Sequence, residues 1–223
     1  MTLARKRGEF LILAGEDRLM TSSLHISEEK LAAETLATGD YRRVLIGGLG
    51  MGFTLRAALD NLPQDAEVVV AELVSEVVNW NREFLGKLNN HPLRDPRASV
   101  VIGDVANLLG GHEKWDAILL DVDNGARAFT KEGNDALYDE DGIGRITDSL
   151  NPGGVWAVWS TSPNRSFERR LKRAGFRVKT LRIEESLGKT KYYNYLFIAK
   201  LNRNSEYSAT QAAKTLNAHP RNV

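Results

Sequence analysis

The sequence predicts an α/β protein with a doubly wound, mostly parallel seven-stranded sheet whose last strand is reversed, preceded by a small N-terminal β-hairpin and helix. Two observations lead to this prediction. Apolar runs alternate with segments of helical period along most of the chain. These runs are continuous rather than alternating, as expected for strands that helices cover on both faces. Strand–helix–strand repetition of this kind favours a parallel sheet.

Residues 1–40 are expected to form the small N-terminal piece. The segment "GEFLILAGEDRLMTS" predicts a hairpin of two short strands around the turn residues 15–17. The segment "SEEKLAAETLATGD" predicts a helix with Ser27 as its N-cap, acidic residues in its first turn and Gly39 at its end.

Residues 41–202 are expected to form the main domain. Five of its strands are predicted in "RVLIGG", "AEVVVAEL", "ASVVIGD", "WDAILLDVD" and "GVWAVWS". The last two apolar runs, "FRVKTLRI" and "YYNYLFIAKL", are joined by only about ten residues without a helical pattern, whereas parallel strands need a crossover of a dozen or more. This final pair is therefore predicted to be antiparallel. Residues 203–223 are polar and are expected to form a flexible tail.

Composition excludes several classes of function. The chain has 223 residues, a formal net charge of +1 and no cysteine. A charge near zero gives no general reason to expect nucleic acid or an anionic membrane as a partner. The absence of cysteine removes disulfides, thiol nucleophiles and cysteine–zinc sites. No apolar run approaches the roughly 20 residues that span a bilayer, and the short apolar run near the N-terminus does not predict a signal peptide, so a cytoplasmic location is expected.

The stretch "RVLIGGLGMGFTLRAALD" places glycines at every second position where the first strand of the main domain meets a helix. Such a bare backbone lets a ligand lie against N–H groups and the positive helix end. A dinucleotide pattern would need glycine at the position of Phe53, so the spacing is more typical of a site for a nucleoside sulfonium. The residues of this predicted loop are Gly48, Leu49, Gly50, Met51 and Gly52. A purely structural turn is the alternative.

Acidic residues follow the next three predicted strands. Glu72, followed by Leu73, comes some twenty residues after the glycines, where a carboxylate can accept both hydroxyls of a ribose. Asp104, followed by Val105, suits the adenine amino group, although it also suits a helix cap.

The fourth strand ends with Asp121 and Asp123. Carboxyl ends of parallel strands share one edge of the sheet, where open α/β sheets bind ligands. Acids that converge there would repel one another, which favours a cationic ligand such as a sulfonium or an amine.

From residue 42 to about residue 200 the chain resembles the spermidine synthase family, the polyamine aminopropyltransferases. The segments that carry the resemblance are "RVLIGGLGMGFTLRAAL", "VVVAEL", "DPRASVVIGDVANLL", "WDAILLDVDNG" and "LNPGGVWAVW". The resemblance implies the AdoMet-dependent methyltransferase fold and a pocket for S-adenosylmethionine (AdoMet) or decarboxylated AdoMet. In it, Glu72 would lie at the ribose, Asp104 near the adenine and Asp121 at the reacting centre, where it helps to deprotonate the attacking amine.

The sequence departs from the family where the polyamine is held. The family's loop reads G-G-G-D-G-G, and Met51 stands in place of its acid. The family's D-S-S-D after the fourth strand is "DVDN" here, so Asp121 matches while Asn124 replaces the second acid. The N-terminal Tyr-His-Glu and C-terminal Ser-Gly-x-Trp signatures are absent.

The resemblance therefore implies a transferase that moves an alkyl group, aminopropyl in the first instance, to a small amine. Asp121 is expected to act as base, with Asp123 and Asn124 orienting the acceptor; a simple turn at 123–125 is the alternative. The long connection after Asp123 is expected to be a substrate loop, with Phe129, Asn134 and Tyr138 at the acceptor. The alternative is that Leu137 and Tyr138 anchor the following helix in the core. Methyl transfer from AdoMet and a non-catalytic nucleoside-binding protein remain alternatives.

Other partners have weak support in the sequence. The four histidines lie far apart without ligand spacing, so no metal is expected. The basic segment "RSFERRLKRAGFRVK" reads as the solvated face of a helix with Phe167 and Leu171 pointing inward, so no nucleic acid is expected. The family resemblance suggests a homodimer.

Overall fold

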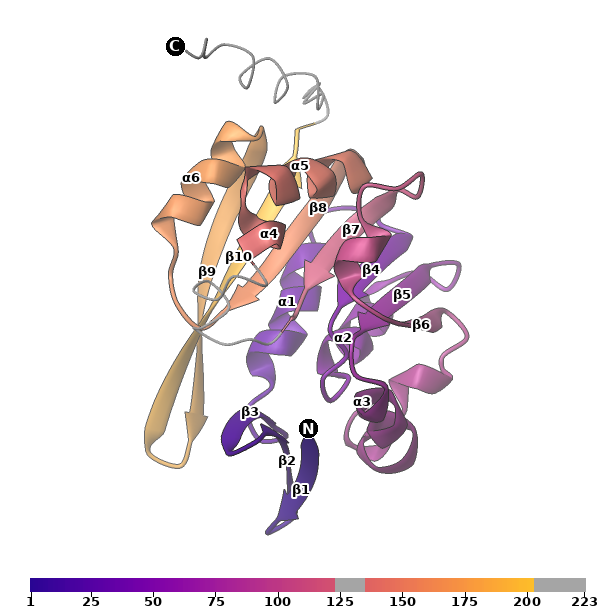
Figure 1. Cartoon of the computed structure of the whole chain (residues 1–223), viewed down its shortest axis with the longest axis vertical. Coiled ribbons are helices and arrows are strands. Elements are labelled where there is room, and N and C mark those ends of the chain that lie inside the picture. Colours follow the sequence, from indigo (N-terminus) through magenta and orange to yellow (C-terminus); the bar gives the residue numbers. More distant parts are fainter. Residues whose placement is uncertain (123–134, 203–223) are drawn as a thin grey trace, which may run out of the picture.

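The computed structural model describes residues 1–122 and 135–202, and its main feature is a seven-stranded sheet in the order β6-β5-β4-β7-β8-β10-β9 (Figure 1). The strands are β4 (Arg43–Gly47), β5 (Glu67–Glu72), β6 (Ala98–Ile102), β7 (Trp115–Leu120), β8 (Leu150–Ser160), β9 (Phe176–Leu187) and β10 (Thr190–Leu201). Strands β6, β5, β4, β7 and β8 pair in parallel. The last strand, β10, pairs antiparallel with both β8 and β9. The predicted sheet with a reversed last strand is confirmed.

Three helices cover one face of the sheet and three cover the other (Figure 1). The first set is α1 (Ile26–Leu36), α2 (Phe53–Asn61) and α3 (Ser75–Trp80). The second is α4 (Asp135–Tyr138), α5 (Glu140–Ser149) and α6 (Arg165–Arg173). Neighbouring residues of one strand, such as Leu45 and Ile46, enter opposite cores. This burial of both strand faces explains the continuous apolar runs in the sequence.

Aromatic side chains fill the core on the second face. Trp156 of β8 and Phe167 of α6 meet edge to face with ring centroids 5.5 Å apart, and both are buried. Phe167 and Leu171 are completely buried, which confirms the prediction that they form the inward side of the basic helix. Helix α6 is thereby fixed against β8 and β10 while its basic residues stay at the surface.

The N-terminal region contains a three-stranded antiparallel sheet, β1 (Thr2–Lys6), β2 (Glu9–Ala14) and β3 (Asp17–Thr21). The predicted hairpin is the β2–β3 pair, whereas β1 was not predicted, because the basic, half-exposed sequence "TLARK" has no apolar face of its own. Ile12 packs with Met51, Phe53 and Leu85 and attaches this sheet to the main domain.

The predicted N-cap of the first helix is wrong by two residues. Helix α1 begins at Ile26 after His25, so Ser27 lies inside the first turn and is completely buried. Its hydroxyl contacts two glutamate side chains instead of a helix amide. Helix α1 also packs on α2 and on the sheet strands, so it covers the main sheet directly. The predicted division at residue 40 stays a prediction.

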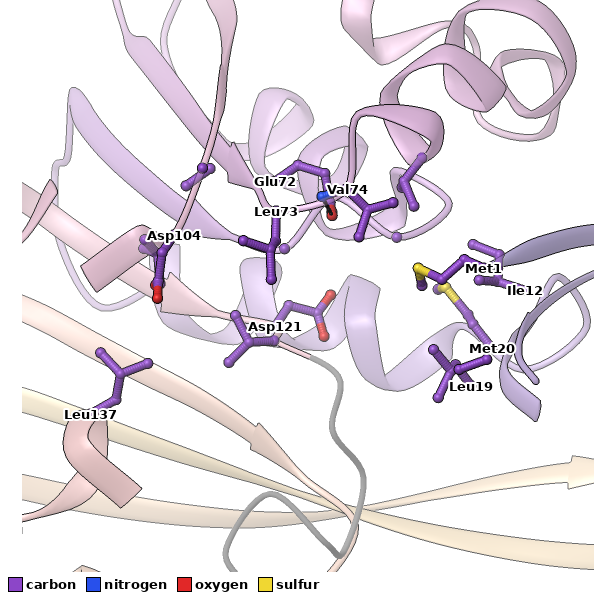
Figure 2. Close-up of a pocket in the computed structure, with 18 residues that line it drawn as sticks. Met1, Ile12, Leu19, Met20, Glu72, Leu73, Val74, Asp104, Asp121 and Leu137 are labelled. Atoms are coloured by element: carbon purple, nitrogen blue, oxygen red, sulfur yellow. Dashed lines mark hydrogen bonds between the residues drawn. The ribbon is translucent and has the colours of Figure 1, made fainter. Parts of the chain in front are cut away.

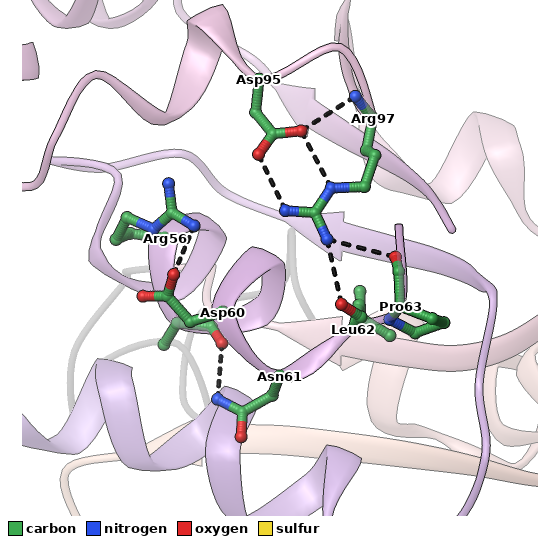
Figure 3. A network of polar contacts seen from close by, with 8 residues as sticks. Arg56, Asp60, Asn61, Leu62, Pro63, Asp95 and Arg97 are labelled. Atoms are coloured by element: carbon green, nitrogen blue, oxygen red, sulfur yellow. Dashed lines mark hydrogen bonds and ion pairs between the residues drawn. The ribbon is translucent and has the colours of Figure 1, made fainter. Parts of the chain in front are cut away.

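A network of opposite charges lies between α2 and the start of β6 (Figure 3). Arg97 donates from Nε and Nη2 to the two oxygens of Asp95, and its Nη1 donates to the carbonyl oxygens of Leu62 and Pro63. This bidentate pair lowers the pKa of Asp95 to about 2, chiefly through the hydrogen bonds from Arg97. Through these hydrogen bonds the network joins the connection between α2 and β5 to the connection that precedes β6.

Within the described residues, none of the helices combines the length and the apolar character needed to cross a bilayer.

Candidate active site

A pocket of about 360 Å³ opens at the carboxyl ends of the parallel strands (Figure 2). This volume lies in the range of small-molecule sites, about 300–1,000 Å³. Its described lining comes from the N-terminal region, the glycine loop after β4, the ends of β5, β6 and β7, and helices α3 and α4. The lining residues are Met1, Ile12, Ala14, Leu19, Met20, Gly48, Gly50, Ala71, Glu72, Leu73, Val74, Val77, Gly103, Asp104, Val105, Asp121, Val122 and Leu137.

Most of the predicted site residues that the structure describes line this pocket. They are Gly48, Gly50, Glu72, Leu73, Asp104, Val105 and Asp121. The side chains of Leu49 and Met51 are buried instead, and Gly52 forms the left-handed N-cap of α2. Asp123 and Asn124, together with Phe129 and Asn134, lie outside the described residues.

The glycine loop is held close to the neighbouring strand and to two asparagines. At Gly48, which has a φ of 90°, an added Cβ would lie 2.3 Å from the carbonyl oxygen of Asp121, so no side chain fits there. Asn81 Nδ2 donates to Gly50 O at 2.8 Å, and Asn89 Nδ2 donates to Met51 O at 2.7 Å. The loop that faces the pocket is therefore fixed by side chains from beyond α3.

Glu72 lies at the end of β5 and is 8% exposed. Its Oε2 accepts from Leu49 N at 2.8 Å, and its Oε1 accepts from Val74 N at 2.9 Å. The carboxylate thus joins the glycine loop to the start of α3. Each carboxylate oxygen can accept a second hydrogen bond, so Glu72 keeps the capacity to accept two hydroxyls from a ligand.

Asp104 is both a cap and a pocket residue. It precedes the 3₁₀ turn η4 (Val105–Leu108), and its Oδ1 accepts from Ala106 N at 2.8 Å. The two roles considered from the sequence are thus compatible in one side chain. In Figure 2, Asp104 lies on the far side of Leu73 from the methionines, so the pocket is elongated along the sheet edge.

Asp121 lies centrally in the pocket, directly after β7 (Figure 2). Its Oδ2 accepts a hydrogen bond from Thr54 Oγ1 of α2 at 2.5 Å. Burial and then the charge of Asp121 raise the pKa of Tyr138, and the same charge adds to burial in raising the pKa of Glu28. Asp121 is therefore held by a hydrogen bond from α2, and its negative charge disfavours ionisation of Tyr138 on α4 and of Glu28 on α1.

One part of the site was missed from the sequence. Ile12, Leu19 and Met20 of the N-terminal sheet form an apolar wall opposite Leu73 and Val74 (Figure 2). An added Cβ at Gly50 would approach Met20 Sδ to 3.0 Å, so the wall lies directly on the glycine loop. The one signal in the sequence is the apolar residues of the hairpin, and the same pattern is equally typical of residues that pack in a hydrophobic core.

Curated relatives with similar sequences are polyamine aminopropyltransferases. The enzyme named so in Aeropyrum pernix is 31% identical over 158 residues, which are 70% of this chain and 49% of that protein. The one from Synechococcus sp. is 37% identical over 137 residues, 56% of this chain and 44% of that protein. The chain thus spans about half the length of the curated relatives it matches. No family model matches the chain.

Solved structures agree with these relatives in fold. A spermidine synthase in complex with the transition-state analogue AdoDATO superposes with a TM-score of 0.70 at 18% identity, covering 96% of this chain and 74% of that one. The chain is a divergent spermidine synthase-like protein. Human methyltransferase-like protein 13 in complex with SAH superposes with a TM-score of 0.59 at 21% identity over 89% of this chain and 92% of that one, which confirms the methyltransferase-type fold.

The charged side chains that line the pocket of this spermidine synthase-like protein, among the residues described, are all acidic: Glu72, Asp104 and Asp121. Such a lining attracts cations and offers hydrogen-bond acceptors to hydroxyl and amino groups. The described part of the chain holds no cluster of three or more histidine, aspartate or glutamate side chains arranged for a metal ion. The arrangement can therefore bind a cationic nucleoside and take up a proton at Asp121.

Proposed function

We propose that this protein is a transferase that moves the aminopropyl group of decarboxylated AdoMet to a small amine. The observation that carries the proposal is the single pocket at the sheet edge that brings together the glycine loop, Glu72, Asp104 and Asp121. The resemblance to polyamine aminopropyltransferases supports the reaction, and the acidic lining supports a donor that carries both a sulfonium and an ammonium charge.

The roles of the binding residues follow from their positions. Glu72 would accept the ribose hydroxyls, and Asp104, farther along the same edge, would accept from the adenine amino group. Leu73 and Val105 also line the pocket and would contact the two faces of the base. Gly48 and Gly50 would bring the backbone close to the sulfur, where a Cβ would take up the space.

The reaction is a displacement at carbon. The amine nitrogen attacks the carbon attached to the sulfonium sulfur, the carbon–sulfur bond breaks, and its electron pair stays on the sulfur of the methylthioadenosine product. The amine loses one proton, which Asp121 would accept. The donor already carries its leaving group, so the protein mainly aligns the nucleophile, a contribution worth about 7 kcal/mol or more when the geometry is well held. Thr54 fixes one oxygen of Asp121 for this task.

Methyl transfer from AdoMet is the second candidate, and one observation favours it. The acid that the family places in the glycine loop is Met51 here, and its side chain is completely buried in an apolar cluster with Ile12 and Phe53. An ammonium group on the donor would therefore have one negative partner fewer here than in the family's glycine loop. Asp121 remains available to a cationic donor tail or to the acceptor amine, which is why aminopropyl transfer is preferred.

The test is a product analysis with matched donors. The protein is incubated with decarboxylated AdoMet or AdoMet and, in each case, with putrescine or a simple monoamine, and nucleoside and amine products are measured by mass spectrometry. Amine-dependent release of methylthioadenosine from decarboxylated AdoMet is expected. Methylated amine and S-adenosylhomocysteine would favour the second candidate, and the absence of any product would contradict both.

The remaining expectations from the sequence are part of the same proposal. A small amine acceptor, a homodimer and a cytoplasmic location would fit a spermidine synthase-like enzyme. Sedimentation of the purified protein tests the dimer, for which a mass of about twice the 24.8 kDa chain is expected.

A further inference from the structure

A buried hydroxyl next to the candidate active site lies between two carboxyl groups. Ser27 Oγ is 2.5 Å from Glu28 Oε2 and 2.7 Å from Glu185 Oε2, and it also accepts from Asn194 Nδ2 at 3.0 Å. A serine hydroxyl has one proton to donate and two lone pairs with which to accept. It can therefore donate to only one of the two carboxyl groups, and the other contact requires a proton on the carboxyl oxygen.

The partners of each carboxyl group decide where this proton resides. Glu185, on β9, accepts from Ile26 N at 2.7 Å and from Asn194 Nδ2 at 2.8 Å, at the positive N-terminus of α1. Donors and a helix N-terminus both stabilise an ionised carboxylate. Within the described residues, the hydrogen-bond partners of the Glu28 carboxyl group are the Ser27 hydroxyl and its own backbone amide, and Glu28 is 8% exposed. The proton therefore resides on Glu28, which donates to Ser27, and Ser27 donates to Glu185.

The charges around Glu28 act in the same direction. Burial first, and then the negative charge of Asp121, raise the pKa of Glu28 to about 8, and Glu185 adds to the shift. Basic groups on the elements packed against α1 have other partners. Arg56 pairs with Asp60, Lys179 with Glu34 and Lys191 with Glu184. Lys200 donates to the carbonyl oxygen of Thr38, and the Arg182 guanidinium lies over the ring of Tyr193. On α1 itself, Glu29 pairs with His25 near the surface.

Thr54 lies between Asp121 and the backbone of Glu28. Its hydroxyl donates to Asp121 Oδ2 at 2.5 Å and lies 3.4 Å from the backbone carbonyl oxygen of Glu28. We propose that Glu28 is a positioning residue that stays protonated so that Asp121 is the ionised acid of the pair. This inference rests on the proposed function for its catalytic meaning, whereas the protonation of Glu28 stands on the contacts of Ser27 and of Glu185.

The catalytic consequence is a dependence of turnover on the charge of Glu28. When Glu28 ionises in alkaline solution, a second negative charge beside Asp121 stabilises the ammonium form of the acceptor, which cannot attack the donor. A Glu28→Gln variant keeps a neutral group of the same size at all pH values. The ratio of E28Q to wild-type turnover is therefore expected to rise about threefold or more between about pH 7 and pH 9.

Glu29→Gln is the matched control, because Glu29 is the next residue of α1 and its side chain is exposed. The E29Q to wild-type ratio is expected to stay constant over the same range. A constant E28Q ratio would overturn the proposed role of Glu28. A large loss for E28Q with an intact fold at neutral pH would also overturn it, because an ionised carboxylate would then be required.

A second measurement needs neither a substrate nor a variant. Infrared difference spectra of the wild-type protein between neutral and alkaline pH are expected to show the loss of a protonated carboxyl band, and E28Q, where it folds, is expected to lack this band. No protonated carboxyl at neutral pH would overturn the inference. If the band is present but no donor and amine give product, the proposed function fails while the protonated Glu28 remains.

Discussion

Two polar clusters of this protein hold carboxyl groups in opposite ways. In the cluster around Arg97, both carboxylate oxygens of Asp95 accept hydrogen bonds from the guanidinium of Arg97 (Figure 3). These hydrogen bonds lower the pKa of Asp95 to about 2. In the cluster around Ser27, the acids Glu28 and Glu185 face each other and Asp121, and burial with like charges raises the pKa of Glu28. The first cluster pairs its carboxylate with a guanidinium, whereas in the second a serine hydroxyl lies between two carboxyl groups.

The difference separates structural support from candidate chemistry. The Asp95–Arg97 pair joins two connections of the chain, and neither residue lines the pocket. In the part of the chain that the structure describes, Glu28 and Glu185 form hydrogen bonds with a serine, an asparagine and a backbone amide, and with no lysine or arginine side chain. Perturbed carboxyl groups that a fold does not neutralise are typical of functional sites. Substitutions near Asp121 are therefore expected to change turnover, and substitutions in the Asp95–Arg97 pair are expected to change stability.

The largest effect is expected at Asp121. Asp121→Asn removes the proton acceptor while keeping the size of the side chain, so turnover should fall on the order of 100-fold or more. Binding of methylthioadenosine, measured by calorimetry, should change little. Asp60→Asn on α2, where Asp60 pairs with Arg56 at the surface, is the control and should keep full turnover. Activity retained in D121N would remove the role assigned to Asp121.

The opposite pattern is expected in the other cluster. Arg97→Met leaves the Asp95 carboxylate and two backbone carbonyl oxygens without their donor, so the free energy of unfolding should fall by about 2–3 kcal/mol. Turnover per folded molecule should be unchanged. Chemical denaturation and an activity assay at low temperature measure the two quantities. A loss of turnover with normal stability would show that the clusters are not separate.

The pH dependence of stability should differ between the clusters. Asp95 has a lowered pKa in the folded state, so its contribution is complete above its ordinary value of 3.8 and is lost as the pH falls through about 2. Glu28 has a raised pKa, so its contribution is complete below 4.5 and is lost as the pH rises through about 8. The fall in melting temperature between about pH 4 and pH 2 should therefore be smaller in R97M, and the fall between about pH 4.5 and pH 8 should be smaller in E28Q. If both variants changed the melting temperature over the same pH range, this assignment would be contradicted.

A smaller effect is expected for nucleoside binding. Glu72→Ala leaves the amides of Leu49 and Val74 without an acceptor and removes the proposed partner of the ribose. Methylthioadenosine should bind more weakly by about 1–3 kcal/mol in calorimetry. Because the substitution also loosens the glycine loop, the comparison ligand is adenine, which lacks the ribose. An equal loss of affinity for adenine would argue against a direct contact of Glu72 with the ribose.

The smallest effect is expected at Thr54. Thr54→Val keeps the shape of the side chain and removes the hydroxyl that donates to Asp121, so turnover should fall by a few-fold, about 1 kcal/mol in activation free energy. Thr54→Ser restores the donor and should recover most of the rate. Equal rates for the valine and serine variants would show that this hydrogen bond does not position Asp121.

The main sheet could be predicted from the sequence because its pattern is redundant. Each parallel strand is an apolar run bounded by turn residues, and the short link between β9 and β10 requires antiparallel pairing. Strand β1 could not be predicted in this way, since its residues gain order only through pairing with β2. Ser27 was assigned as a cap from its local sequence, but Glu185, which is 158 residues away, captures its hydroxyl.

The site was predictable where residues follow strand ends, and it was not where contacts are distant in sequence. Gly48, Glu72, Asp104 and Asp121 reach one pocket because parallel strands end at one edge. The wall around Met20 depends on how the N-terminal sheet docks, which no local pattern encodes. The charge state of Glu28 likewise depends on its burial and on β9. Motifs alone therefore predicted which strand-end residues share one pocket, but they did not predict the surroundings of Asp121.

The most direct measurement of the central claim is calorimetry with decarboxylated AdoMet, AdoMet and methylthioadenosine side by side. The account predicts that all three bind to one site per chain, with decarboxylated AdoMet tightest because the pocket lining that the structure describes is acidic. Glu72→Ala should weaken all three, and Asp121→Asn should leave methylthioadenosine binding intact. If none of the three binds, the pocket is not a site for a sulfur-bearing adenosine, and the account is contradicted.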